Sequence, residues 1–179
     1  MALTSTIHHF SLQLSDVDRG VYEQFELKLA RHPSETAAFM LVRLLAYCLE
    51  YREGIALSEG VAAVDEPAVL VRDLTGRITA WIEVGAPDVE RLHRGSKLAG
   101  VAAVYTHRDP VPLLAQYAGR KLHRAEEIPL YDFDPAFLEA VAAAIERRNE
   151  MSLSVTERQL YLELNGKHYT SAVGERRLG

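Results

Sequence analysis

Apolar and polar residues alternate with the two-residue period of β-strands at the start of the chain. Residues 3–14 and Val21–Leu29 both show this alternation, and the turn-like segment Ser15–Gly20 separates them. Two alternating runs around such a turn predict a β-hairpin.

A three- to four-residue spacing of apolar side chains then predicts a helix that begins near Ser34 and that Gly54 ends. Ser34 is the expected N-cap, and Glu35 would lie near the positive end of the helix dipole. The apolar face contains Met40, Leu41, Leu44, Leu45 and Cys48. Cys48 is therefore expected to be a buried structural thiol rather than a nucleophile.

Short strands separated by turns are expected next, at Val61–Val64, Val69–Val71 and Arg77–Gly85. The segment Asp65-Glu66-Pro67 interrupts the first two of these strands, and Asp73–Gly76 forms the turn before the third. In an extended third strand, one face would carry Ile78, Ala80, Ile82 and Val84, and the other Thr79, Trp81 and Glu83. A single strand tryptophan such as Trp81 is expected to pack in the core.

Helices and strands alternate in the second half. We expect a helix from Pro87-Asp88 to about Ala99, a strand at Val101–Thr106, a helix at Val111–Tyr117, a strand at Ile128–Tyr131, and a helix that Asp134-Pro135 begins and that runs through Ala142 to Arg147. The chain closes with a strand at Ser152–Val155 and a hairpin of Leu160–Leu164 and His168–Val173 around Asn165-Gly166. This order predicts a single α/β domain over residues 1–179, with a mixed β-sheet flanked by helices.

Composition and charge narrow the class of protein. The chain has 179 residues, 48% of them apolar, which suits one soluble domain. It has one cysteine, which excludes a disulfide framework and a multi-cysteine zinc site. It shows neither a secretory signal nor the ~20 consecutive apolar residues of a membrane helix, so we expect a cytoplasmic protein without a membrane partner.

The net charge of −5 excludes a uniform basic coat for nucleic acid, but the charge is unevenly distributed. Residues 91–124 contain seven Lys and Arg residues against one acid, so this segment carries +6 and the rest of the chain −11. On a helix, three of these residues would share one third of the circumference and could follow phosphate groups: Arg91, Arg94 and Lys97. The alternative is an ordinary solvated helix surface.

A group of carboxylates is the second candidate site. Asp65 and Glu66 precede Glu83 by 18 and 17 positions across a predicted turn, so antiparallel strands would bring them side by side. Grouped carboxylate oxygens are suitable ligands for Mg²⁺, and a bound ion can activate water on a phosphodiester. The alternative is a solvated turn at Asp65-Glu66 and a Glu83 paired with an arginine. Inside an apolar strand Glu83 needs a partner, because an unpaired buried carboxylate is costly.

Several motifs together resemble the YaeQ family of bacterial proteins over essentially the whole chain. They are Ala30–Thr36 before the apolar helix, Asp65-Glu66-Pro67, and Trp81–Gly85 with Pro87-Asp88 and Arg91; Met1-Ala2-Leu3 and Tyr105-Thr106 fit as well. The resemblance implies a restriction-endonuclease-like core, a variant of the PD-(D/E)XK nuclease fold, with extra N- and C-terminal β-hairpins.

The resemblance also implies roles for individual residues. Glu83 would be the acid of the acid-x-lysine element and Glu35 a helix carboxylate that supports Mg²⁺. Ala68 stands where the family usually has an acid, and Gly85 where the superfamily has its lysine. The cation would then have to come from Lys97 or Arg91.

Two functions follow from this pattern. The first is a non-catalytic or degenerate member that binds nucleic acid or the transcription machinery in a regulatory role. The alternative is a Mg²⁺-dependent nuclease or phosphodiesterase that uses Glu83 with Asp65 or Glu66, helped by Glu35 and Lys97. The missing acid and lysine favour the first.

Overall fold

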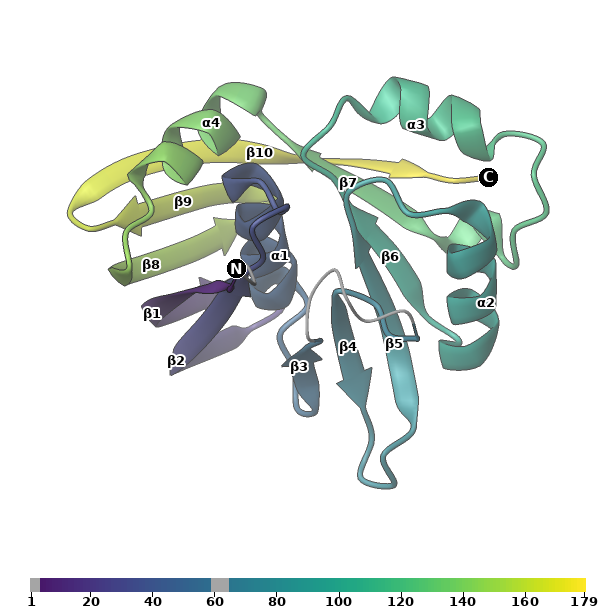
Figure 1. The fold of residues 1–179 in the computed structure, drawn as a ribbon, viewed down its shortest axis with the longest axis horizontal. Helices are drawn as coiled ribbons and strands as arrows, with labels where there is room; N and C mark the ends of the chain where they lie inside the picture. The colour runs from purple at the N-terminus through teal and green to yellow at the C-terminus, as the bar shows by residue number, and fades with distance from the viewer. Residues whose placement is uncertain (1–3, 59–64) are drawn as a thin grey trace.

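The computed structural model describes residues 4–58 and 65–179 and has a mixed α/β fold (Figure 1). Within these residues, ten strands form one curled mixed sheet and four helices pack on it. The elements in chain order are β1 Thr6–Asp16, β2 Val21–Arg31, α1 Ala37–Leu49, β3 Ile55–Leu57, β4 Val69–Arg72, β5 Ile78–Val84, α2 Val89–Ala99, β6 Ala102–Tyr105, α3 Pro110–Tyr117, a 3-10 turn η1 Ala125–Glu127, β7 Pro129–Phe133, α4 Pro135–Ala144, β8 Arg148–Thr156, β9 Gln159–Leu164 and β10 Lys167–Arg177. None of the helices in the described ranges has the length and apolar character needed to cross a membrane.

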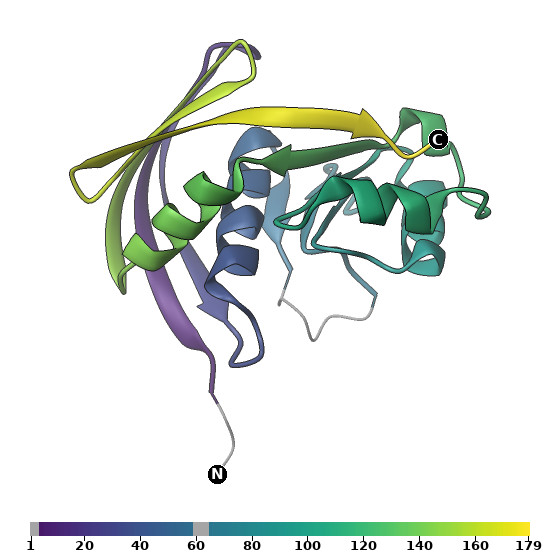
Figure 2. The same ribbon diagram turned by 90° about the horizontal axis from the view of Figure 1, so that it is seen from above.

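The strand order in the sheet is β2-β1-β8-β9-β10-β7-β6-β5-β4-β3. β1 is parallel to β8, and β5, β6 and β7 are parallel to one another, whereas the other neighbouring pairs are antiparallel. β10 joins the two halves, because residues 167–172 pair with β9 and residues 173–177 pair with β7. Figures 1 and 2 show this long yellow strand crossing from one half to the other. The two predicted hairpins are confirmed as parts of this single sheet.

Two apolar layers lie on opposite faces of β5. Ala80, Ile82 and Val84 pack in a large cluster with α1, α4 and the curled strands, whereas Trp81 packs with α2 and α3 in a second cluster. The alternation predicted for these four residues is confirmed. The prediction for Ile78 is wrong, because the β4–β5 register shifts at Val71/Arg72 and Ile78 then packs on the second cluster.

The helix α1 begins later than the sequence predicts. Thr36, not Ser34, is the N-cap, and its hydroxyl accepts a 3.1 Å hydrogen bond from the Phe39 N–H. The Ser34 hydroxyl instead lies 2.7 Å from Nδ1 of His32. Glu35 turns into the protein and is buried, so it forms no part of the first helical turn.

The end of α1 also differs from the prediction. The helix ends at Leu49, where the Arg19 guanidinium donates to the carbonyl oxygens of Cys48 and Tyr51. Gly54 instead serves the turn before β3: it has a φ of +88°, and a Cβ there would lie 2.0 Å from the Arg72 carbonyl oxygen. The sequence pattern did not predict β3.

Asp134 caps α4 as predicted, but the helix ends at Ala144 rather than Arg147. The buried Asn149 side chain accepts from the Glu146 N–H and donates to the carbonyl oxygens of His9 and Glu146. These contacts hold residues 145–147 in an extended path beside β1, and β8 begins at Arg148. The strand predicted at Val61–Val64 lies outside the described residues.

The close contact between α2 and β5 predicts the effect of a single added methyl group. A Cβ at Gly95 would lie 2.3 Å from the Trp81 indole, which is 1% exposed. We expect Gly95→Ala to lower the free energy of unfolding by about 1–3 kcal/mol, because the helix must move away from the sheet. Urea unfolding measures this loss.

The matched control in the same helix is Leu98→Ala. Leu98 is 52% exposed, so its truncation is expected to change the unfolding free energy by no more than about 0.5 kcal/mol. A Gly95→Ala protein with the stability of the wild type would show that α2 is not packed on Trp81 as described.

Candidate functional site

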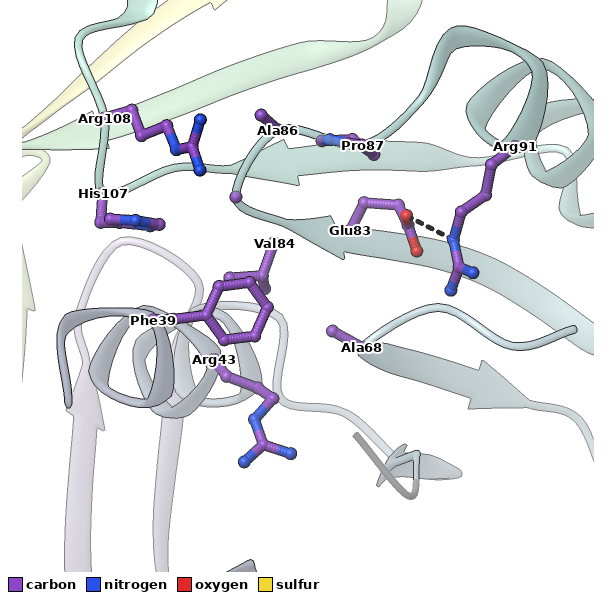
Figure 3. A pocket seen from close by; sticks show the side chains of 11 residues that line it. Phe39, Arg43, Ala68, Glu83, Val84, Ala86, Pro87, Arg91, His107 and Arg108 are labelled. Atoms are coloured by element: carbon purple, nitrogen blue, oxygen red, sulfur yellow. Dashed lines mark hydrogen bonds and ion pairs between the residues drawn. The ribbon is translucent and has the colours of Figure 1, made fainter. Parts of the chain in front are cut away.

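A cavity of about 370 Å³ opens at the carboxyl ends of the parallel strands β5 and β6. The Gly85 N–H donates to the Tyr105 carbonyl oxygen at 2.8 Å and ties the two strand ends together. Crevices at the carboxyl ends of parallel strands are the usual ligand sites of α/β proteins. The cavity is lined by Phe39, Arg43, Ala68, Glu83, Val84, Gly85, Ala86, Pro87, Arg91, His107 and Arg108 (Figure 3).

Glu83 lies in the wall of this cavity and pairs with an arginine. Its side chain is buried, and its Oε2 accepts a 2.8 Å hydrogen bond from Nε of Arg91 on α2 (Figure 3). Arg91 also donates to the Glu66 carbonyl oxygen, so one guanidinium links β5, α2 and the turn before β4. Burial raises the pKa of the Glu83 carboxyl, and the hydrogen bond and charge of Arg91 oppose this shift only in part.

Glu35 is engaged in a second buried ion pair. Its Oε1 lies 3.1 Å from the Arg43 guanidinium, and its Oε2 accepts from the His32 N–H. The same guanidinium donates to the Ala30 carbonyl oxygen. Burial lowers the pKa of Arg43, while Glu35 raises it. Figure 3 shows the Arg43 guanidinium directed away from Glu83, so Glu35 and Glu83 belong to separate ion pairs.

The carboxylates before β4 have other surroundings. Glu66 is half-buried and pairs with Arg72 at 2.8 Å, whereas Asp65 is exposed and lines a different hollow. No group of three or more His, Cys, Asp or Glu side chains that could hold a metal ion occurs among residues 4–58 and 65–179. The structure therefore does not bring the predicted ligands Glu35, Asp65, Glu66 and Glu83 to one point, and these side chains do not fit a Mg²⁺ site as they stand.

Gly85 occupies a position that a lysine cannot take without strain. Its φ is +92°, a left-handed conformation that favours glycine. A Cβ there would also lie 3.0 Å from the Phe39 ring. The backbone conformation and the packing of α1 thus disfavour a lysine at position 85.

Sequence reasoning missed several residues of this cavity, among them Phe39, His107 and Arg108. His107 packs edge to face on Phe39, with ring centroids 6.0 Å apart, and burial followed by the Arg108 charge lowers its pKa. The signal available was position, since His107 and Arg108 follow β6 as Gly85 follows β5. Strands predicted as parallel neighbours place such residues at the same edge.

The predicted basic face of α2 is divided. Arg91 is held by Glu83, whereas Arg94 and Lys97 are exposed and line a separate hollow of about 600 Å³ with Asp65, Trp81, His93 and Leu98. Lys97 therefore does not line the Glu83 cavity for which it was expected to supply a cation. Cys48 is buried, as predicted, and burial raises the pKa of its thiol to about 12, so it stays protonated.

The raised pKa of Glu83 predicts a pH-dependent stability difference for Glu83→Gln. A raised pKa means that the ionised carboxylate destabilises the folded state as the pH rises from the ordinary value of 4.5 through the folded value. The glutamine carries no charge and still offers an oxygen to Arg91. We expect the variant to be at least as stable as the wild type near neutral pH. This advantage should shrink as the pH falls from the raised folded pKa towards 4.5, and it should be absent below 4.5, where Glu83 is protonated in both states.

Urea unfolding at a series of pH values measures this difference. Glu139→Gln, at an exposed site on α4, is the control, and its stability relative to the wild type should not change with pH in this way. A Glu83→Gln protein that becomes progressively less stable than the wild type as pH rises would mean that the Arg91 pair outweighs burial.

Comparison with known proteins places the chain among its relatives. The sequence model of the YaeQ protein family matches residues 1–173. The uncharacterized protein YaeQ of Escherichia coli K12 is 29% identical over 163 residues, which cover 90% of each chain. The crystal structure of YaeQ from Pseudomonas syringae has a TM-score of 0.83 and 30% identity, covering 96% of this chain and 95% of its own. YaeQ from Xanthomonas axonopodis pv. citri gives 0.82 and 27%, covering 97% and 98%. The resemblance seen in the sequence is confirmed, and the chain belongs to the YaeQ family.

Proposed function

We propose that this chain is a non-catalytic nucleic-acid-binding protein built on a restriction-endonuclease-like, PD-(D/E)XK scaffold. The observation that carries the proposal is the contrast between two sets of charges. The acid Glu83 is neutralised by Arg91, whereas Arg94 and Lys97 are exposed and have no ion pair with any described residue. Unpaired surface cations on one helix are suitable contacts for phosphate groups.

Three features of the cavity argue against a hydrolytic role. The guanidinium of Arg91 supplies the positive charge at Glu83 that a metal ion would otherwise supply. Ala68 lines the same cavity with a methyl group where the family usually has a carboxylate. Gly85 holds a backbone conformation and a contact with Phe39 that disfavour a lysine.

The basic surface extends beyond α2. Arg120 and Lys121, in the segment after α3, are also exposed and form no ion pair within the described ranges. This segment is hydrogen-bonded to α2, because the Ser96 hydroxyl donates to the His123 carbonyl oxygen at 2.9 Å. Lys121 therefore lies beside α2 together with the His123 segment, whereas Arg120 lines a separate hollow with residues 86–89.

Loss of two of these cations is expected to weaken nucleic-acid binding in a salt-dependent way. Each phosphate contact removed should lower the slope of log K against log salt concentration by about 0.7–0.9. The double change Arg94→Ala with Lys97→Ala should therefore reduce that slope by about 1.4–1.8 on DNA or RNA. Fluorescence anisotropy with labelled oligonucleotides at several salt concentrations measures it.

The matched control removes two positive charges elsewhere. Lys28 on β2 and Lys167 on β10 are exposed and lie in the other half of the sheet, so Lys28→Ala with Lys167→Ala should keep the wild-type slope. Equal binding by the wild type, the α2 double variant and the control double variant would show that the α2 cations are only an ordinary solvated surface.

A Mg²⁺-dependent nuclease is the second candidate. One observation favours it: Oε1 of the buried Glu83 accepts no hydrogen bond from a described residue, although burial, which raises the pKa of this carboxyl, is opposed in part by the Ala68 N–H and the Trp81 indole, which lower it. Asp65 or Glu66 would have to supply the second carboxylate.

Metal titration separates this candidate from the main proposal. Because Arg91 already neutralises Glu83 and no ligand cluster is present among the described residues, we expect no heat of Mn²⁺ or Mg²⁺ binding by calorimetry. Glu83→Gln serves as the reference for non-specific heat. Saturable binding in the wild type that Glu83→Gln abolishes would favour the nuclease.

A further inference from the structure

Two histidines face each other on the α2 side of the molecule. The segment after α3 is fixed on α2 by the hydrogen bond from Ser96 and by a second one, in which the His123 N–H donates to Nδ1 of His93 at 2.9 Å. Leu122 anchors the same segment in the second apolar cluster. The two imidazole rings lie 6.4 Å apart and nearly perpendicular. The backbone thus holds Lys121 and His123 beside α2.

The hydrogen bond to His93 determines where its ring carries a proton. A backbone N–H is always a donor, so Nδ1 of His93 must be the unprotonated nitrogen that accepts. In the neutral ring the proton then lies on Nε2. His93 therefore presents a fixed Nε2–H donor, which needs no protonation of the ring.

Positive charges surround this donor. Lys97 follows His93 by one helical turn on the same face of α2. Burial is the largest cause that lowers the pKa of His93, and the charges of Lys97, Lys121 and then His123 add to it. Lys121 precedes by two positions the residue His123, whose N–H is bonded to the His93 ring. Neither lysine has an ion pair with the part of the chain that the structure describes.

This arrangement favours a negatively charged ligand over a metal ion. A metal ion would compete with the His123 N–H for Nδ1 of His93 and would be repelled by two ammonium groups. An oxyanion would instead accept from Nε2–H and from both ammonium groups, and such charge-assisted hydrogen bonds are about twice as strong as neutral ones. The adjoining hollow has one acidic residue among its described lining, Asp65.

We propose that His93, Lys97 and Lys121, with the His123 ring at the edge, form a binding site for a phosphate group. The site is separate from the Glu83 cavity, which neither His93 nor Lys97 lines. The phosphate site rests on the proposed function in one respect only: the source of the phosphate group would be the backbone or the end of a nucleic acid. A free phosphate or a small phosphorylated molecule offers the same chemistry.

Nuclear magnetic resonance of the histidine rings in the full chain tests the site with inorganic phosphate at constant ionic strength. Phosphate should shift the ring signals of His93 and His123 and raise the pKa of His93, because an anion stabilises the imidazolium form. The exposed His168, on β10, is the internal control and should not respond. His93→Gln and His123→Gln assign the signals.

Removal of the two ammonium groups gives the quantitative result. Lys97→Ala with Lys121→Ala should weaken phosphate binding by at least about tenfold, whereas Lys28→Ala with Lys167→Ala should leave it unchanged. The ring nitrogen shifts should also show Nδ1 of His93 unprotonated at neutral pH. Histidine signals that do not respond to phosphate, or that respond equally in both double variants, would overturn the phosphate site.

A single-stranded oligonucleotide carrying a 5′-phosphate distinguishes the sources. If phosphate shifts His93 but the oligonucleotide does not bind, the site stands, its ligand is a small phosphate, and the proposed nucleic-acid function fails. If the oligonucleotide binds and leaves both rings unperturbed, nucleic-acid binding stands and the phosphate site at His93 is overturned. Binding that shifts both rings supports both.

Discussion

The ion pair between Glu83 and Arg91 is the interaction on which the candidate site depends. It buries a carboxylate near the carboxyl end of β5, and a buried charge is tolerated only with a partner. Arg91 provides that partner from α2 and also holds the turn at Glu66 through the backbone. The same guanidinium therefore positions α2 over β5, closes one side of the cavity and occupies Glu83. An acid that the sequence predicts as a candidate metal ligand thus forms an internal ion pair in this structure.

Local signals predicted most of the fold. The Asn165-Gly166 turn, the Asp88 and Asp134 caps and the alternation of β5 from Ala80 to Val84 are all short-range features, and the structure confirms them. The errors arise where distant residues decide. Asn149 ends α4 early through contacts with β1, and the β4–β5 register shift moves Ile78 to the other face. A single sequence contains no record of those contacts.

The candidate site could be predicted only in part for the same reason. The apolar surroundings of Glu83 in the sequence require a partner, and an arginine was one of the partners considered. Whether the partner of Glu83 is a metal ion, Arg91 or another cation depends on how α2 packs over the sheet. Glu35 shows the opposite case: a residue expected near a helix dipole is withdrawn into a pair with Arg43, eight positions later. Spacing along the chain identified the carboxylates, but three-dimensional packing assigned their partners.

The structure separates the cations of the basic segment into those that form ion pairs and those that do not. Within the +6 segment, Arg91 is neutralised by the buried Glu83, and Arg124 lies 3.7 Å from Glu127 in an exposed pair. The cations without an ion pair among the described residues are Arg94, Lys97, Arg108, Arg120 and Lys121. Two hydrogen bonds from the His123 segment to α2 bring several of these together. Like charges held close by the backbone repel one another, and binding an anion relieves that repulsion. The fold thus collects positive charge on α2 while it uses its buried arginines to neutralise its own acids.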